Sequence, residues 1–346
     1  MSTLTLLKEV LFHATLVIDY ISYYINYILC LVFHYIFNEP PPFPIEKPTP
    51  TYHPAVLVTG TSTGIGQNAA ITLARMGYTV FATVRKQVDA DDLTHLFQQY
   101  VNTNQGNLIP IIMDVTDKGD IQKAQNIVRN VLGRDKPLVG LINNAAQAKH
   151  LQAELTSDAT FREIFETNFF AVANLTKAFL PMLREGRGRV INIGSIASWE
   201  ATISMGAYSS SKAALRALTK VWRMELRRLG VFVSLIEPGM IDTRLTHETN
   251  QNFLDLNLFR ETPRHINPAV IVHYKEQYRT AGKYSNEFID TIPPPALVTD
   301  AIVNALTAKY PKTTYYVGLD AKALAMISWL LGERGTEALQ GLILGF

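Results

Sequence analysis

The sequence predicts an α/β fold, in which a single domain with a doubly wound parallel sheet follows an N-terminal hydrophobic segment. Short apolar runs alternate with stretches of helical periodicity from residue 55 onward. Such alternation produces right-handed crossovers and a sheet covered by helices on both faces. A glycine-rich turn after the first apolar run also favours this fold. The strands are expected at 55–59, 79–83, 108–113, 138–142, 189–193, 231–236 and 314–317.

Helices are expected in the intervals between these runs and after them. The apolar periodicity favours helices from the end of the glycine turn through 76 and at 91–100, 121–132, 161–183, 208–229 and 294–310. Residues 240–293 are patterned more loosely and carry only short helical stretches. The folded domain is therefore expected to extend over 55–320, with an apolar tail at 321–346.

The N-terminal 38 residues are strongly apolar and are predicted to anchor the chain in a membrane. Residues 20–38 contain no Asp, Glu, Lys or Arg, and as a helix they would span about 28 Å. A cleaved signal peptide is disfavoured because no small-x-small cleavage site precedes the prolines. A helix packed on the domain surface remains the alternative. The topology is open, and a membrane-associated location, such as the endoplasmic reticulum or a lipid-droplet surface, is expected.

A proline-rich segment at 39–54 separates this anchor from the domain. It contains seven prolines between Pro40 and Pro54, which exclude a helix or an interior strand. The segment is interpreted as a semi-rigid linker, with a loop wrapped over the domain surface as the alternative.

Charge and cysteine content exclude several classes of function. The formal net charge is +2 without a long basic run, so nucleic acid is not expected as a partner. The single cysteine, Cys30, excludes an intrachain disulfide framework and a cysteine-based zinc cluster. We expect no metal.

Tyr208 and Lys212 are the leading candidates for catalysis. They are four residues apart, so on a helix they share one face. An ammonium beside a phenol lowers the phenol pKa, which would make Tyr208 a general acid and base for an alcohol or carbonyl. Ser195 closes a predicted strand and would hydrogen-bond the same substrate oxygen. A solvated surface pair is the alternative for a lone Tyr-x-x-x-Lys.

The glycine-rich turn lies between the first predicted strand and the helix that follows it. Gly60, Gly64 and Gly66 permit a tight turn and a close approach of the backbone to a pyrophosphate at a helix N-terminus. Strand, glycine turn and helix in this order are the context that a dinucleotide site requires.

Six motifs in register resemble those of the short-chain dehydrogenase/reductase family. They are Thr59-Gly60-x-x-x-Gly64-Ile65-Gly66, Asn143-Asn144-Ala145, Asn168, Ser195, Tyr208-x-x-x-Lys212 and Pro238-Gly239. The resemblance covers about residues 55–318 and implies a Rossmann-type fold. The apolar N-terminus, Phe81-Ala82-Thr83-Val84-Arg85 and Val317-Gly318-Leu319-Asp320-Ala321 are similar to the membrane-associated retinol and hydroxysteroid dehydrogenase branch.

The resemblance implies a set of residues that bind the cofactor. Gly60, Gly64, Ile65 and Gly66 would hold the pyrophosphate, and Asp114 and Val115 would face the adenine. Asn143 and Ala145 would lie near the adenosine ribose. Pro238 and Gly239 begin the segment in which Ile241 and Thr243 would bind the nicotinamide carboxamide.

The resemblance also implies catalytic roles for four residues, and it implies no metal. Tyr208 would exchange the proton, Lys212 would lower its pKa and bind the nicotinamide ribose, Ser195 would polarise the substrate oxygen, and Asn168 would hold a relay water. Structural alternatives are a helix cap for Asp114, a helix kink for Asn168 and a turn for Ser195.

The end of the second predicted strand indicates the cofactor. Val84 stands where a carboxylate would bind the ribose of NAD, and Arg85 follows it. Arg85 would bind a 2′-phosphate, assisted by the Thr63 hydroxyl, so NADP(H) is expected to be preferred, with NAD(H) possible. A solvated Arg85 is the alternative. Ala146 replaces the usual glycine of the family, and we expect the enzyme to tolerate it.

The predicted activity is an NADP(H)-dependent oxidoreductase that interconverts a lipophilic alcohol with its ketone or aldehyde, such as a steroid, retinoid or lipid carbonyl. Segment 240–293 would bind the substrate, and the tail at 321–346 would close over it, dock on the membrane or pack as core. The alternatives are a keto-lipid reductase of phospholipid or sphingolipid synthesis and a catalytically idle nucleotide-binding membrane scaffold. The expected partners are a lipophilic substrate and a membrane, with a homodimer possible.

Overall fold

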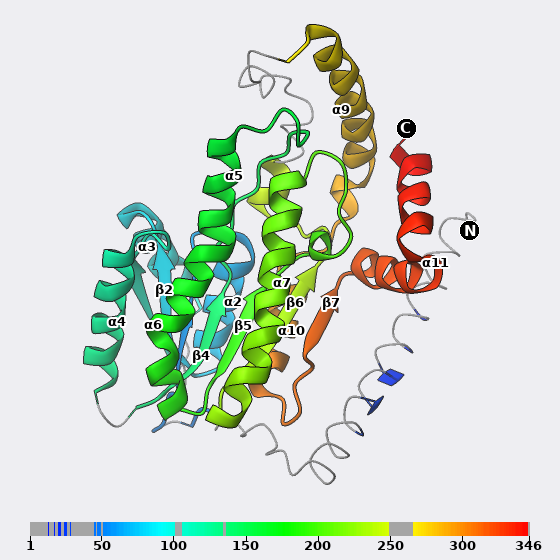
Figure 1. The fold of residues 1–346 in the computed structure, drawn as a ribbon. Helices are drawn as coiled ribbons and strands as arrows, with labels where there is room; N and C mark the ends of the chain where they lie inside the picture. Colours follow the sequence, from blue (N-terminus) through cyan, green and yellow to red (C-terminus); the bar gives the residue numbers. More distant parts are fainter. Residues whose placement is uncertain are drawn as a thin grey trace.

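The protein folds around one parallel sheet with the strand order β3-β2-β1-β4-β5-β6-β7 (Figure 1). This computed structural model describes residues 51–100, 106–133, 136–248 and 266–344, together with a few positions before residue 51. All six strand pairings are parallel. The strands are β1 Ala55–Val58, β2 Thr79–Val84, β3 Asn107–Ile112, β4 Leu138–Asn143, β5 Arg189–Ile193, β6 Phe232–Pro238 and β7 Thr314–Val317.

Helices cover both faces of this sheet, as the strand–helix alternation predicts (Figure 1). Residues of α2, α3 and α10 pack in one core cluster with one set of strand side chains. Residues of α4, α6 and α7 form a second cluster with the other set. The bounds are α2 Gly64–Arg75, α3 Gln87–Gln98, α4 Lys118–Leu132, α5 Asp158–Phe165, α6 Ala171–Glu185, α7 Gly206–Leu226, α9 Pro268–Phe288, α10 Ala296–Thr307 and α11 Leu319–Leu344.

Strand β1 shows why the strands are continuous apolar runs. Ala55 and Leu57 belong to the cluster under α4, α6 and α7, whereas Val56 and Val58 belong to the opposite cluster. Successive side chains of a strand point to opposite faces, so a strand buried on both sides needs apolar residues at every position.

The strand order reverses beside β1, because β2 and β3 lie on one side and β4 to β7 on the other. Ligands of such sheets bind at this switch point, beyond the carboxyl ends of the strands.

The helix predicted at 161–183 is interrupted. Between α5 and α6 the chain forms a π-helical turn, Glu166–Phe170, which contains the fully buried Asn168. The Asn168 side chain bonds both backbone groups of Gln147, at 2.8 and 2.9 Å. These tertiary bonds fix the position of the turn, and π-helical turns are often found at functional sites.

The described part of the proline-rich segment lies on the domain. Ile45 is buried in the core cluster beside α2 and α10. The His53 Nδ1 atom is 2.7 Å from the carbonyl oxygen of Gly77, and Thr49 and Tyr52 form a short antiparallel bridge. At these positions the segment behaves as a loop on the domain surface, which is the alternative to an extended spacer.

The predicted anchor at 1–38 lies almost wholly outside the described residues. The few positions described there, such as Tyr20 and Tyr24, are helical and exposed. Within the described part of the chain, no helix is both long and apolar enough to cross a membrane.

Helix α11 contains most of the apolar tail and bends at Gly332, which has a φ of 65° (Figure 1). Ala321 and Thr336 are buried. Trp329, by contrast, is 83% exposed, and Leu330, Leu331 and Leu342 are also exposed. Ordinary core packing therefore accounts for only part of the tail.

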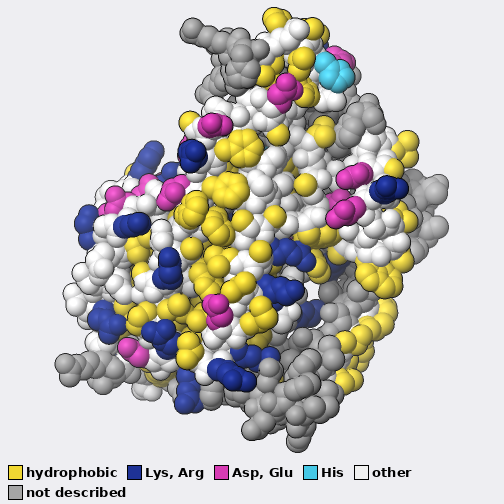
Figure 2. All heavy atoms as spheres, in the orientation of Figure 1, with side chains coloured by type: hydrophobic (Ala, Val, Ile, Leu, Met, Phe, Trp, Pro, Cys, Tyr) yellow, Lys and Arg dark blue, Asp and Glu magenta, His cyan; other side chains and the backbone are white. Residues whose placement is uncertain are grey.

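A second group of exposed apolar side chains lies over the long helices beside the sheet. Phe170, Val221 and Met224 are exposed on the segment that leads into α6 and on α7. Figure 2 shows apolar side chains gathered near the middle of the face formed by α5, α6 and α7. The two groups of exposed apolar side chains lie on different elements.

Candidate active site

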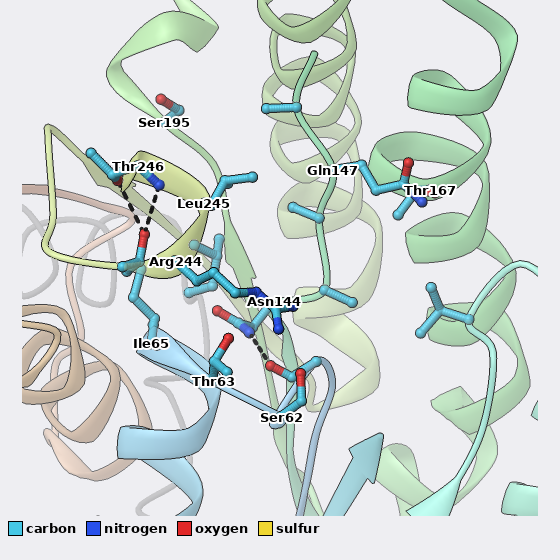
Figure 3. A pocket seen from close by; sticks show the side chains of 18 of the residues that line it. Ser62, Thr63, Ile65, Asn144, Gln147, Thr167, Ser195, Arg244, Leu245 and Thr246 are labelled. Carbon is cyan, nitrogen blue, oxygen red and sulfur yellow. Dashed lines mark hydrogen bonds between the residues drawn. The ribbon is translucent and has the colours of Figure 1, made fainter. Parts of the chain in front are cut away.

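A cavity of about 420 Å³ opens at the carboxyl edge of the sheet (Figure 3). The segments after β1, β2, β3, β4, β5 and β6 and the first turns of α7 line it. Most of the predicted site residues lie here, namely Gly60, Thr63, Gly64, Ile65, Arg85, Asp114, Val115, Ala145, Ser195, Tyr208, Lys212, Pro238, Gly239, Ile241 and Thr243. Gly66, Asn143 and Asn168 are not among the lining residues.

The glycine turn has the geometry that its sequence predicts. Gly60 and Gly64 have φ values of 66° and 63°, a region that favours glycine. A Cβ atom on Gly66 would lie 2.2 Å from the carbonyl oxygen of Gly60. Helix α2 has no acidic residue in its first turn, and the side chain of its N-cap residue, Thr63, does not cap it. The positive end of the helix dipole thus faces the cavity uncompensated, which suits a dinucleotide phosphate.

Asn143 is the last residue of β4 and Asn144 follows it, and the two have different positions. Asn143 does not line the cavity, so its place beside the adenosine ribose stays a prediction. The Asn143 amide is buried beneath the site, where it donates to Asn192 and Thr176 at 2.8 and 3.0 Å. Asn144 instead lines the cavity and donates to the carbonyl oxygens of Thr59 and Gly60 at 2.9 and 3.1 Å.

Asp114 and Arg85 lie where the adenosine end of a dinucleotide is expected. The Asp114 carboxylate accepts from the backbone N–H and the hydroxyl of Thr116 at 2.8 and 2.7 Å. Asp117, not Asp114, is the N-cap of α4, so the capping alternative for Asp114 was wrong. Arg85 is exposed at the end of β2 and lines the cavity.

Ser195 is both a turn residue and a wall of the cavity. Its hydroxyl accepts from the Ala197 N–H at 3.2 Å, and the Ser198 hydroxyl accepts from the Ser195 N–H at 3.2 Å. This reciprocal capping box starts a 3₁₀ turn and fixes the orientation of Ser195.

Tyr208 and Lys212 occupy successive turns at the start of α7 and are both buried. The Lys212 Nζ atom donates to the carbonyl oxygen of Ile193 at 2.8 Å and lies 5.8 Å from the centroid of the Tyr208 ring. Burial lowers the pKa of Lys212 to about 8. Burial also raises the pKa of Tyr208, while the Ser195 hydroxyl acts in the opposite direction.

The expected lowering of the Tyr208 pKa by Lys212 is therefore not seen in this structure. Desolvation disfavours the phenolate more than the neighbouring groups favour it. The Tyr208 phenol is thus neutral and protonated near pH 7.

The Asn168 side chain hydrogen-bonds the backbone of the segment after β4 and a side chain of α7. Besides its two bonds to Gln147, its Nδ2 atom donates to the Ser211 hydroxyl on α7 at 3.0 Å. Asn168 therefore ties the cavity segment after β4 to the helix that bears Tyr208. The relay water stays a prediction.

Hydrogen bonds tie the segment after β6 to β7 and α11, and its Thr243 packs against the glycine turn. The Gly239 N–H donates to Val317, and the Met240 N–H donates to the Asp320 carboxylate at 2.6 Å. The Thr243 hydroxyl lies 3.0 Å from that of Thr246, and the Thr243 side chain lies against Gly64. A Cβ atom on Gly64 would meet Thr243 Cγ2 at 3.2 Å.

Some lining residues were not singled out from the sequence. Asn144 directly follows a strand, and that position is a usable signal. Lys149 and Arg244 also line the cavity, but no local pattern distinguishes them from surface cations. Ala146 lines the cavity and is not among the residues with positive φ, so the backbone does not require glycine there.

The short chain dehydrogenase family model matches residues 54–253 of this chain. The chain belongs to the short-chain dehydrogenase/reductase family. It is an NAD(P)-dependent oxidoreductase, and its glycine turn fits the dinucleotide that this family uses.

Relatives within this family include human 11-beta-hydroxysteroid dehydrogenase type 2, which is 34% identical over 81% of this chain and 67% of its own length. Rat 17-beta-hydroxysteroid dehydrogenase type 6 is 32% identical over 77% and 81% of the two chains. Mouse retinol dehydrogenase 5 is 31% identical over 82% and 86%. These similarities support the predicted resemblance to the retinol and hydroxysteroid dehydrogenase branch.

Solved structures of short-chain dehydrogenases have a similar fold. A short-chain dehydrogenase from Streptomyces avermitilis is 27% identical and superposes with a TM-score of 0.63 over 81% of this chain and 94% of its own. An alcohol dehydrogenase from Thermococcus sibiricus, complexed with 5-hydroxy-NADP, is 26% identical with a TM-score of 0.50 over 55% and 78%.

Proposed function

We propose that this oxidoreductase interconverts a lipophilic alcohol and its ketone or aldehyde with NADP(H). The observation that carries this proposal is the joint position of Ser195, Tyr208 and Lys212 on one cavity with the glycine turn. A proton donor, a polarising hydroxyl and a cation then surround the place where a carbonyl meets the cofactor.

When bound, the nicotinamide supplies or accepts the hydride. In carbonyl reduction, the Tyr208 hydroxyl gives its proton to the substrate oxygen, and the Ser195 hydroxyl hydrogen-bonds that oxygen. The Lys212 ammonium stabilises the tyrosinate that results. Burial keeps Tyr208 protonated, which is the form needed for reduction. Alcohol oxidation uses the same residues in reverse and requires the phenolate.

Tyr208→Phe tests this assignment, because it removes the proton but keeps the ring. We expect NADPH turnover with a panel of lipophilic ketones to fall by at least about 10³-fold in this variant, while cofactor binding stays intact. Equal rates in both proteins would overturn the catalytic role and favour a nucleotide-binding scaffold.

The preference for NADP(H) is supported by Arg85 at the end of β2. No carboxylate precedes it there to repel a 2′-phosphate, because Val84 occupies that position. The variant Val84→Asp with Arg85→Ala should reverse the ratio of kcat/KM for NADPH and NADH. Retention of the wild-type ratio would rule out this role of Arg85.

A lipophilic substrate is supported by the relatives named as hydroxysteroid and retinol dehydrogenases. In this proposal residues 240–293, including α9, form the substrate side of the catalytic domain, which extends over 55–320. Helix α9 packs beside the site, where the Tyr278 hydroxyl donates to the His150 carbonyl oxygen. A keto-lipid reductase is the second candidate, and a panel of steroid, retinoid and long-chain keto-lipid substrates separates the two.

The proposed location is a membrane surface, with residues 1–38 as the anchor and 39–54 as the connection. Exposed Trp329, Leu330 and Leu331 on α11 support contact with lipid. Co-flotation of the full chain with neutral phosphatidylcholine vesicles tests this. The triple substitution of these residues by serine should weaken flotation.

A homodimer is proposed through the helices beside the site. The exposed Phe170, on the turn before α6, and the exposed Val221 and Met224, on α7, support it. Light scattering of the purified protein should give twice the chain mass, and Met224→Asp should shift it toward the monomer.

A further inference from the structure

Arg244 is a cation in the cavity to which no role has been assigned above. It follows Thr243 and lines both this cavity and a second cavity of about 410 Å³ beside α2. Its side chain is 56% exposed, and its Nε atom lies 3.3 Å from Glu248 Oε1 in the same segment. An exposed pair at this spacing is weak, so Arg244 can exchange Glu248 for another anion at little cost.

The segment that carries Arg244 lies against the glycine turn. The side chain of Thr243 contacts Gly64 at the start of α2. Figure 3 shows Arg244 extending from this segment across the cavity toward Asn144, on the side where Thr63 and Ser62 line it. Asn144 itself donates to the Gly60 carbonyl oxygen, so Arg244 approaches the turn that fits the dinucleotide diphosphate.

The other cations of the described cavity lining have different neighbours. Lys212 donates to Ile193 beside Tyr208, and Lys149 pairs with Glu163 at 3.3 Å. Arg85 stands at the end of β2, at the predicted position of a 2′-phosphate. Arg244 is the described lining cation next to the start of α2, where the two negative charges of a diphosphate would lie.

We propose that Arg244 binds the diphosphate of the dinucleotide and that it leaves Glu248 to do so. This inference rests on the proposed function, to which it adds Arg244 as a residue that binds the cofactor. The guanidinium forms charge-assisted hydrogen bonds with the phosphate oxygens and holds residues 243–248 over the cofactor. Glu248 competes with the cofactor for the same cation.

The test measures the dissociation constants of NADPH, NADH, ADP-ribose and adenosine 2′-monophosphate by calorimetry at fixed salt. Arg244→Gln should weaken the first three about tenfold and leave adenosine 2′-monophosphate, which lacks the diphosphate, within twofold. Arg244→Lys should recover part of the loss. Glu248→Gln should tighten the binding of the three diphosphate ligands severalfold.

Two matched variants serve as controls. Arg85→Ala should weaken NADPH and adenosine 2′-monophosphate but not NADH or ADP-ribose, so the three ligands other than NADPH distinguish the two arginines. Arg75→Gln removes a cation that lines only the neighbouring cavity, so it should change none of the four constants by more than twofold.

Two outcomes would overturn the inference. One is an Arg244→Gln variant that binds NADPH within twofold of the wild type. The other is an equal loss for ADP-ribose and adenosine 2′-monophosphate, which would indicate a general charge effect. Both outcomes leave the proposed function standing if the wild-type protein binds and oxidises NADPH. A wild-type protein that binds neither dinucleotide contradicts the proposed function itself.

Discussion

The Arg216 Nη1 atom lies 2.8 and 3.0 Å from the two carboxylate oxygens of Glu237, whose side chain is fully buried. Glu237 precedes Pro238 at the end of β6, and its Cγ atom lies 3.3 Å from the place of a Cβ on Gly194. Burial raises the pKa of Glu237 to about 7, while the Arg216 guanidinium and the Ser198 hydroxyl oppose this. Because Ser198 also bonds the Ser195 N–H, this ion pair supports the turn that presents Ser195.

Removal of one partner of the Arg216–Glu237 ion pair should destabilise the fold. Arg216→Met is expected to lower the free energy of unfolding by about 2–3 kcal/mol, below the range for a fully buried pair because Arg216 is about a third exposed. Urea denaturation measures the loss. The double variant with Glu237→Gln should show a coupling energy of about 1 kcal/mol or more. Additive losses would indicate that the two side chains act independently.

The pH dependence of carbonyl reduction should follow Lys212. With a pKa of about 8, its ammonium is present below pH 8 and is lost above it. The neutral amine no longer stabilises the tyrosinate, so kcat/KM is expected to be level between pH 6 and 7.5 and to fall about tenfold per unit well above pH 8. The guanidinium of a Lys212→Arg variant keeps its charge over this range. Its kcat/KM should be lower than that of the wild type, and its pH profile should show no break below pH 10. A wild-type profile level to pH 10 would contradict this role.

His150 should make the fold sensitive to acid. Burial lowers its pKa from 6.5 to about 4, so between these values the unfolded chain binds more protons than the folded one. The stability that the neutral His150 contributes is present above pH 6.5 and is lost as the pH falls toward 4. Between pH 7 and pH 5 the loss from this group is about 2 kcal/mol.

Replacement of His150 by Gln should remove this part of the pH dependence, measured as the difference in unfolding free energy between pH 7 and pH 5. The exposed His95 is the control, and His95→Gln should keep the wild-type difference. An unchanged difference in the His150→Gln protein would show that other groups cause the acid sensitivity.

Gly66 should not tolerate even a methyl group. An alanine Cβ there would lie 2.2 Å from the Gly60 carbonyl oxygen and 2.4 Å from the Asn144 amide nitrogen. We expect Gly66→Ala to cost about 2–4 kcal/mol of stability and to weaken NADPH binding at least tenfold, because the turn must open. Thermal unfolding and calorimetry provide the two measurements. In α4, Gly119→Ala would meet only the capping carboxylate of Asp117, at 3.0 Å, so it should cost less stability than Gly66→Ala and leave NADPH binding within twofold.

Most strands could be predicted from the sequence because they are buried on both faces, as β1, β2, β4 and β5 are. β5 has the predicted bounds, Arg189–Ile193, and β6 differs by one residue at its start and two at its end. The common location of Tyr208 and Lys212 at the cavity also follows from their spacing. Local patterns carry this information, since each depends on periods of two or about four residues.

Features that depend on tertiary contacts could not be predicted. The π-helical turn at Asn168 depends on Gln147, 21 residues earlier. The direction in which the Tyr208 pKa shifts depends on how fully the folded chain buries the phenol. The pairing of Arg216 with Glu237, which are 21 residues apart, likewise requires β6 to lie beside α7.

The hydrogen bond from the Met240 N–H to Asp320 has a consequence for biosynthesis. Asp320 lies in the first turn of α11, and this helix follows the last strand of the sheet. While a ribosome makes the chain from its N-terminus, the glycine turn and Tyr208 emerge long before residue 320 does. The segment after β6 gains its final support only when synthesis is nearly complete. A nascent chain that stops before Asp320 therefore leaves the cavity unfinished.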